Sequence, residues 1–235
     1  MSRVNFHLDI ELKTPLQIQA GFGRHGLHQG LVCNHEGAPF IPASSLKGRL
    51  RFQAQRFDHI LNLHRNSTRP KVAPATFLFG DPSHRGHLFL DQAQPVVEFK
   101  DQASLRDIRA SIQVNRDTGT VDEGHLRLFE AVPAQFRFHS QASLVMPSGW
   151  QYPSTQLSSL DDLTAADWAV FYLLGAMRLC DRLGGGKTRG NGHIALVCSD
   201  WRSPKSTQEL AVWRSGERQA WFTAVLERVL KGDRT

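Results

Sequence analysis

Apolar and polar residues alternate in two stretches of the chain, which is the period-two pattern of a strand with one buried face. Residues 4–12 place five apolar side chains on one face: Val4, Phe6, Leu8, Ile10 and Leu12. Residues 135–145 alternate in the same way. Shorter apolar stretches at residues 86–91, 95–99 and 193–198 favour further strands, the last of them buried. These patterns predict a sheet built around two long, half-buried strands.

Three other stretches repeat apolar residues at helical spacing. In the first, the repeating positions are Leu46, Leu50, Ala54, Phe57 and Leu61, with Ser44 and Ser45 before them as candidate N-caps. Residues 167–182 predict an amphipathic helix with Thr164 as its N-cap, and residues 209–230 predict a closing helix. Trp201, Trp213 and Trp221 lie near the end of the chain, where core packing is favoured over a subunit interface.

Residues 108–116 and 124–130 favour the two arms of a hairpin, because Asp and Gly in residues 117–122 are turn formers. Residues 21–30, 66–74 and 147–159 lack periodicity and are predicted to be loops. Strands and helices are mixed along the chain. The sequence therefore predicts an α+β fold in which helices pack on an antiparallel sheet.

Composition narrows the class of protein. The chain has 235 residues, a net charge of +6 and a pI near 9.6, which point to a polyanionic partner. No apolar run is long enough to span a bilayer, and the N-terminal residues lack the apolar core of a signal peptide. Cys33, Cys180 and Cys198 are scattered, with no pair at metal-ligand spacing. We expect a reduced, cytoplasmic protein that has no membrane partner and no structural metal.

The main candidate for a binding site is a glycine loop at residues 183–194, LGGGKTRGNGHI. Its candidate ligand-binding residues are Gly185, Gly186, Lys187, Thr188, Arg189, Gly190 and Asn191. Successive backbone amides in such a loop can form a concave site for an anion, and a phosphate chain is the ligand that the two cations favour. The spacing and the flanking elements do not match a nucleoside-triphosphate loop. A long flexible connector is the alternative interpretation.

A second candidate lies at the start of the helix predicted from residue 44. Ser44, Ser45, Lys47, Arg49 and Arg51 all lie near a helix N-terminus, where unpaired N–H groups and a partial positive charge favour phosphate. The alternative is an ordinary surface helix with solvated basic side chains. The phosphate hypothesis requires the glycine loop and this helix start to converge on the same sugar–phosphate backbone.

Three segments in this order resemble a known family. Residues 41–51 (IPASSLKGRLR) are similar to its IPGSSLKGxLR signature, and residues 112–119 (IQVNRDTG) with 128–130 (LFE) are similar to its VxIDRxTG…LFxxE segment. Residues 183–194 resemble its GGxxxRGxG loop. The chain is thereby identified as a member of the RAMP superfamily (repeat-associated mysterious proteins) of CRISPR systems. It most resembles the seventh-Cas-type backbone subunits of type III effector complexes.

The resemblance implies a fold. It would be one domain over residues 1–235, with an RRM-like (ferredoxin-like) β-α-β-β-α-β core whose helices lie on one face of an antiparallel sheet. Residues 66–100 would be an insertion, and residues 103–130 would be an inserted thumb hairpin. Residues 206–232 would form a C-terminal helix.

The resemblance also implies partners. These are a CRISPR guide RNA, a target nucleic acid, other CRISPR effector subunits and further copies or paralogues of the chain. The glycine loop and the helix start would contact the guide backbone, together with Asn115 and Arg116 of the hairpin. The thumb would separate the guide–target base pairs into segments, and backbone contacts of this kind accept any guide sequence.

The sequence departs from the family pattern at two places, a mild change and one that bears on catalysis. The signature glycine is Ala43, and the aspartate that target-cleaving members carry before the serine motif is absent from residues 26–34, where His28 is the candidate catalytic residue. We therefore expect a binding subunit without target cleavage and without a cofactor.

Two alternatives to that expectation remain open. One is an RNA endonuclease, which would use His25 and His28, or Mg²⁺ held near Glu36, Asp117 or Asp122. The other is an RNA-binding module outside CRISPR, although the RNA-stacking motif of such modules is missing.

Overall fold

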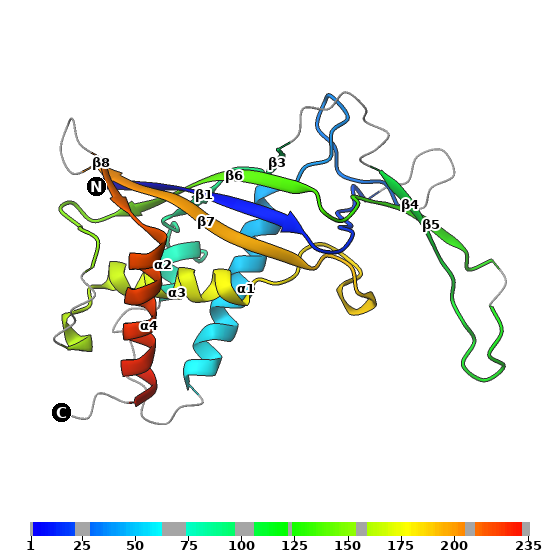
Figure 1. The fold of residues 1–235 in the computed structure, drawn as a ribbon. Helices are drawn as coiled ribbons and strands as arrows, with labels where there is room; N and C mark the ends of the chain where they lie inside the picture. Colours follow the sequence, from blue (N-terminus) through cyan, green and yellow to red (C-terminus); the bar gives the residue numbers. More distant parts are fainter. Residues whose placement is uncertain are drawn as a thin grey trace.

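The computed structural model describes residues 2–21, 29–62, 74–96, 106–121, 124–153, 159–204 and 210–231. A sheet forms one layer, and the helices cover one of its faces (Figure 1). The strands are β1 Ser2–Leu12, β2 Leu88–Leu90, β3 Gln94–Pro95, β4 Asp107–Ser111, β5 Arg127–Ala131, β6 Arg137–Met146, β7 Ile194–Pro204 and β8 Leu210–Trp213. The helices are α1 Ala43–Asn62, α2 Pro74–Phe79, α3 Ala165–Leu179 and α4 Ser215–Lys231, with short 3₁₀ turns η2 Leu160–Asp162 and η3 Lys187–Arg189. The predicted α+β class is confirmed.

In the described part of the chain, the larger sheet has the order β2-β6-β1-β7-β8, and β3 also pairs with β6. Every pairing in it is antiparallel. The long strand predicted at residues 4–12 is β1, and each apolar residue of its inner face is at most 1% exposed. The strand predicted at residues 193–198 is longer, and it is half-buried rather than buried, since Val197 is 57% exposed.

The start of α1 differs from the prediction. Its five apolar repeat positions are buried as expected. Ser44 and Ser45, however, lie inside the first turn and are not N-caps. The carbonyl of Pro42 accepts the first helical bonds, from the amides of Ser45 (3.0 Å) and Leu46 (3.2 Å). Ile41 and Ala93 exchange two backbone hydrogen bonds: the Ile41 amide donates to the Ala93 carbonyl (3.0 Å), and the Ala93 amide donates to the Ile41 carbonyl (2.9 Å). This pairing fixes the chain immediately before the helix.

Helix α3 is the centre of the helical layer. The N-cap prediction is confirmed, because the Thr164 hydroxyl accepts from the Asp167 amide and the Asp167 carboxylate accepts from the Thr164 amide. The amphipathic prediction is wrong: residues 166–177 are all buried. The helix also ends at Leu179, earlier than expected. The segment between Asp167 and Arg178 carries no charge, so the helix can be surrounded by the sheet, α1, α2 and α4.

The C-terminal prediction needs a correction. Residues 210–213 form strand β8 on the edge of the sheet, and α4 begins only at Ser215. Core packing is confirmed for Trp201 and Trp221, which are fully buried, and Trp201 stacks on Phe6 at 4.6 Å between ring centroids. Trp213 belongs to β8, where it pairs with Trp201. A chain that pairs with β7 cannot be helical, whatever its own propensity.

Residues 66–100 contain more structure than the sequence suggested. Helix α2 was not predicted, and β2 confirms the strand expected at residues 86–91. Of the strand expected at residues 95–99, the described part contains only Pro95 in a strand, at the end of β3 (Gln94–Pro95). Residues 63–73 and 97–105 lie outside the described residues.

The hairpin prediction is confirmed. Strands β4 and β5 pair antiparallel, with Ser111 opposite Arg127 and Asp107 opposite Ala131. Their arms continue to a turn in which the Asn115 amide donates to the Thr120 carbonyl (2.8 Å). The hairpin extends away from the body of the molecule, at the end opposite α4 (Figure 1). Five of its apolar side chains are at least half exposed: Ile108, Ile112, Val114, Val121 and Leu126.

We predict that Gly175→Ala destabilises the protein although alanine is the better helix former. A Cβ at position 175 would lie 2.5 Å from the Phe57 ring. Overpacking of this kind costs about 1–3 kcal/mol, which exceeds the gain of about 1 kcal/mol in helix propensity. Urea unfolding measures the difference. Gly216→Ala in α4 is the matched control, because no described atom lies within 4 Å of its added Cβ. A Gly175→Ala protein as stable as the wild type would contradict the packing described for α1 and α3.

Candidate nucleic-acid interface

The glycine loop and the start of α1 lie together, as the phosphate hypothesis requires. They line one groove of about 510 Å³, called here the central groove. Its residues are Gln17, Ile18, Gln19, Ser44, Ser45, Gly48, Arg49, Phe52, Leu183, Gly184, Gly185 and Lys187. Segments that are more than 130 residues apart in the chain therefore share one surface. The sequence predicted two of these segments and missed the third, residues 17–19.

The glycine loop is a folded element and not a flexible connector. The amides of Gly185 and Gly192 donate to the carbonyls of Gln17 (2.7 Å) and Pro15 (2.8 Å). A Cβ at Gly192 (φ +72°) would lie 1.9 Å from the Leu183 carbonyl oxygen, and one at Gly184 (φ +73°) would lie 2.3 Å from the Gln17 carbonyl oxygen. These glycines are needed for close backbone contact, and several loop amides are used within the protein.

The exposed part of the loop is its tip. Lys187, Thr188 and Arg189 form the 3₁₀ turn η3, and all three are exposed. Glycines in the left-handed region precede and follow the turn, and they reverse the chain at each side of it. Asn191 is only 8% exposed and lies under the tip, close to Gly186. Among the predicted loop residues, Lys187 and Arg189 therefore face solvent, whereas the side-chain amide of Asn191 is buried.

The cations near the start of α1 divide into two groups. Arg49 faces the glycine loop: its Nε donates to the Arg182 carbonyl (2.9 Å), and its guanidinium lies 3.8 Å from the Asp181 carboxylate. Lys47 points the other way and donates to the Leu88 carbonyl of β2 (3.0 Å). Burial, with the nearby Arg51, lowers the pKa of the Lys47 ammonium below its usual value. Lys47 is therefore placed outside the central groove.

Arg51 also turns away from the glycine loop. Its guanidinium donates to the carbonyls of Phe79 (2.8 Å) and Gly80 (3.3 Å), at the end of α2. Helical geometry explains the division, because residues two apart on a helix point in different directions. Ser44 and Ser45 are exposed and line the groove beside Arg49.

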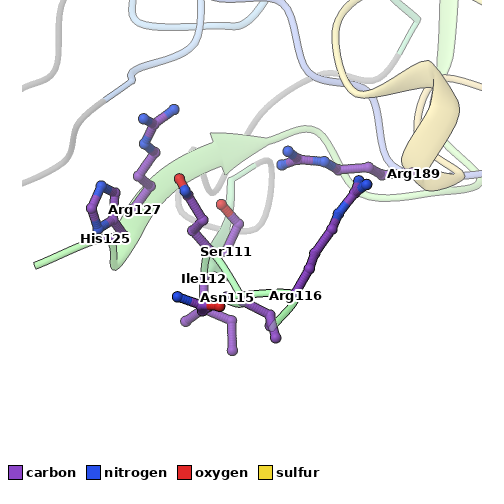
Figure 2. A pocket seen from close by; sticks show the side chains of 9 residues that line it. Ser111, Ile112, Asn115, Arg116, His125, Arg127 and Arg189 are labelled. Atoms are coloured by element: carbon purple, nitrogen blue, oxygen red, sulfur yellow. The ribbon is translucent and has the colours of Figure 1, made fainter. Parts of the chain in front are cut away.

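A second hollow of about 580 Å³, called here the hairpin groove, lies between the hairpin and the loop tip. Its lining residues are Ser111, Ile112, Gln113, Val114, Asn115, Arg116, His125, Arg127 and Arg189. In Figure 2, the Arg116 side chain extends from the hairpin toward the loop tip, which carries Arg189. This lining set, all within the described residues, contains three arginines and no carboxylate. Three arginines in a lining set without a carboxylate favour an anionic ligand.

Hydrogen bonds of Gln29 link the central groove to the base of the hairpin. The Gln29 carbonyl accepts from the amide of Glu130 in β5 (3.0 Å), and its side-chain oxygen accepts from the Gln17 amide group (3.3 Å). The Glu130 carboxylate in turn accepts from the Leu31 amide (3.0 Å). The base of the hairpin is therefore fixed to the floor of the central groove. Nothing in the sequence marks Gln17 or Gln29, because polar residues in loops have no periodic pattern.

A third cluster lies on the sheet face opposite the helices. Cross-strand pairing brings together His7, Asp9, His139 and Ser199. The Asp9 carboxylate accepts hydrogen bonds from His139 (2.8 Å) and from Ser199 (2.8 Å). The ring centroids of His7 and His139 lie 4.6 Å apart. Burial raises the pKa of the Asp9 carboxyl, but these hydrogen bonds outweigh it and the pKa lies below its usual value.

The remaining catalytic predictions have different outcomes. His25 and His28 lie outside the described residues, and so does Asp122. Glu36 and Asp117 are exposed. Within the described ranges, no group of three or more His, Cys, Asp or Glu side chains is arranged to hold a metal ion.

Similarity to known proteins indicates the family of the chain. No curated protein matches the chain. In the part of the chain that the structure describes, no helix has the length and apolar character needed to cross a membrane. A family model described as RAMP superfamily matches residues 9–195, from β1 to the start of β7. The match contains both grooves and covers most of the chain, so the protein belongs to the RAMP superfamily, which indicates a CRISPR-associated, RNA-binding role.

Proposed function

We propose that the protein is a CRISPR guide-RNA-binding backbone subunit of a type III-like effector complex. It holds the sugar–phosphate backbone along a basic track that consists of Arg49, Lys187, Arg189, Arg116 and Arg127. One observation carries this proposal: the loop tip contributes to both grooves, with Lys187 in the central groove and Arg189 in the hairpin groove. A single strand that follows the loop tip would therefore contact both.

The chemistry of the track fits a backbone and not a particular base sequence. Guanidinium and ammonium groups bind phosphate by charge, while the hydroxyls of Ser44 and Ser45 can donate to phosphate or sugar oxygens. The first turn of α1 adds its partial positive charge beside these serines. Contacts of this kind are independent of sequence, which is what a subunit that carries different guides requires.

The finer fold assignment is part of this proposal. We interpret β1-α1-β2-β6-α3-β7 as an RRM-like core within one domain, which is supported by the order β2-β6-β1-β7 and by helices on one face. The β4–β5 hairpin is the proposed thumb. Its exposed apolar side chains, among them Ile112, Val114 and Leu126, support a contact with the guide–target duplex or a neighbouring subunit. We place the assembly in the cytoplasm, with further copies or paralogues and other effector subunits as partners.

Removing the charges of the track should release RNA. The triple variant Lys187→Gln, Arg189→Gln, Arg116→Gln should bind single-stranded RNA about tenfold or more weakly, because it loses charge-assisted phosphate contacts. The slope of log K against log salt should fall by about 2, at about 0.7 per phosphate contact for single strands. Fluorescence anisotropy over a salt series measures both. When the protein is expressed with a CRISPR array, the same variant should retain less guide RNA.

The matched control removes the same number of charges outside both grooves. Arg85, Arg214 and Lys231 are exposed and line neither groove. Their change to glutamine should leave the slope almost unaltered. Equal losses in the two triple variants would reject the track and leave only general electrostatic attraction.

The opposite directions of Lys47 and Arg49 give a second test. Arg49→Gln should weaken RNA binding, because Arg49 lines the central groove. Lys47→Gln should leave RNA binding unchanged and lower the free energy of unfolding by about 1 kcal/mol, since it removes the bond to the Leu88 carbonyl. Binding isotherms and urea unfolding separate the two effects. A greater loss of RNA affinity in Lys47→Gln than in Arg49→Gln would contradict the placement of the track.

RNA cleavage is a second candidate function, which the cluster on the open sheet face favours. Asp9 holds His139 by one ring nitrogen, and His7 lies against it, so two imidazoles are available for general acid–base chemistry on a 2′-hydroxyl. The same polar groups also suit the solvated face of an antiparallel sheet. The absence of the family aspartate from residues 26–34 favours binding without cleavage.

A labelled-RNA assay decides between the two. We expect end-labelled guide precursor and target RNA to remain intact with the purified complex, both in Mg²⁺ and in EDTA. Cleavage in EDTA that His7→Ala or His139→Ala abolishes would establish the sheet face as an active site. Cleavage that His28→Ala alone abolishes would assign the activity to the loop before the serine motif.

A further inference from the structure

Phe52 is an aromatic residue of α1 that the fold leaves open. Its side chain is 49% exposed, whereas Leu50, Ala54 and Phe57 of the same helix are at most 6% exposed. It lies on a different face from the core stripe and lines the central groove. Within this groove of cations and hydroxyls, the exposed ring of Phe52 offers an apolar surface on which a flat group of a ligand can stack.

The central groove has free space beside Phe52, at Gly48. Gly48 lies one turn before Phe52 and also lines the groove. No described atom lies within 4 Å of a Cβ placed at Gly48, so packing within the protein does not require glycine there. Glycine in a helix interior lowers stability relative to alanine. Its presence between Ser45 and Phe52 leaves space against the helix for a bound molecule.

The neighbours of Phe52 supply the other half of a nucleotide-binding surface. The Arg49 guanidinium carbon lies 5.2 Å from the centre of the Phe52 ring, and its bond to the Arg182 carbonyl restrains it there. Lys187 and the serines of α1 line the same groove. The aromatic face suits a base, and the cations and hydroxyls suit the attached phosphate. At about 510 Å³, the groove lies within the range of about 300–1,000 Å³ that is usual for small-molecule sites.

We propose that Phe52 forms a nucleobase-stacking subsite in the central groove, where one base of the bound RNA strand lies on its ring. The inference rests on the proposed function and extends it from backbone contact to one unstacked base per subunit. Stacking on an aromatic ring accepts any base, because every base has a π face, so it is compatible with guides of any sequence.

The test compares two probes that differ only in their bases. One is a fluorescein-labelled single-stranded RNA, and the other has the same backbone with abasic nucleosides. Phe52→Ala should weaken binding of the first probe about tenfold and leave binding of the abasic probe unchanged, since only the first can stack. Phe52→Tyr should bind both like the wild type. Gln55→Ala, an exposed change on α1 outside the groove, is the control.

Each other outcome overturns a defined part of the inference. Equal losses on both probes in Phe52→Ala would show a structural role, which thermal unfolding would confirm, and no loss on either probe would reject the subsite. Unchanged RNA binding with lower self-association of Phe52→Ala in sedimentation would assign Phe52 to a protein contact. The Lys187, Arg189 and Arg116 triple variant should lose affinity for both probes. If it loses neither, or if the wild type binds neither probe, the proposed function itself fails.

Discussion

Close backbone contact between the glycine loop and residues 15–17 is the constraint on which both grooves depend. The hydrogen bonds from Gly185 to Gln17 and from Gly192 to Pro15 hold the loop against the chain that leaves β1. A side chain at Gly184 would meet the Gln17 carbonyl, and one at Gly192 would meet the Leu183 carbonyl within the loop, so only glycine fits at either position. Because the two ends of the loop are fixed, its tip projects at a defined place, and the cations of η3 are directed between α1 and the hairpin.

The core supports this arrangement by making α3 rigid. The helix leads directly into the glycine loop and is buried from residue 166 to residue 177. The Phe222 ring of α4 stacks on its Phe171, and the Phe57 ring of α1 packs against the same ring at a tilt. A site carried by well-packed elements needs little ordering when a ligand binds, so less of the binding free energy is lost. The exposed hairpin is different, since β4 and β5 pair mainly with each other.

Connection between the grooves has a physical consequence for a bound strand. Gln29 links the floor of the central groove to β5, and Arg189 links the loop tip to the hairpin groove. An RNA strand held by Lys187 and Arg189 would therefore reach the hairpin at a fixed position. In the function proposed above, fixed spacing between backbone contacts would present a guide at regular intervals along a row of copies, without any contact that depends on its sequence.

The sequence by itself determined the elements whose residues repeat with a regular period. It specified β1, β6, the apolar stripe of α1, the Thr164 cap and the hairpin, because alternation and helical spacing depend on local geometry. It also identified the glycine loop and the α1 start as candidate phosphate sites, since those residue types carry the chemistry wherever they lie.

Only the tertiary structure decided which of these residues meet. It separated Arg49 from Lys47, although they are two residues apart, because a helix directs them to different neighbours. It turned residues 210–213 into a strand by pairing them with β7, and it surrounded α3 with other elements. It added Gln17 and Phe52 to the lining of the candidate site, and Gln29 as a hydrogen-bond partner of Gln17. Contacts between distant segments depend on how the whole chain packs, and no local pattern encodes them.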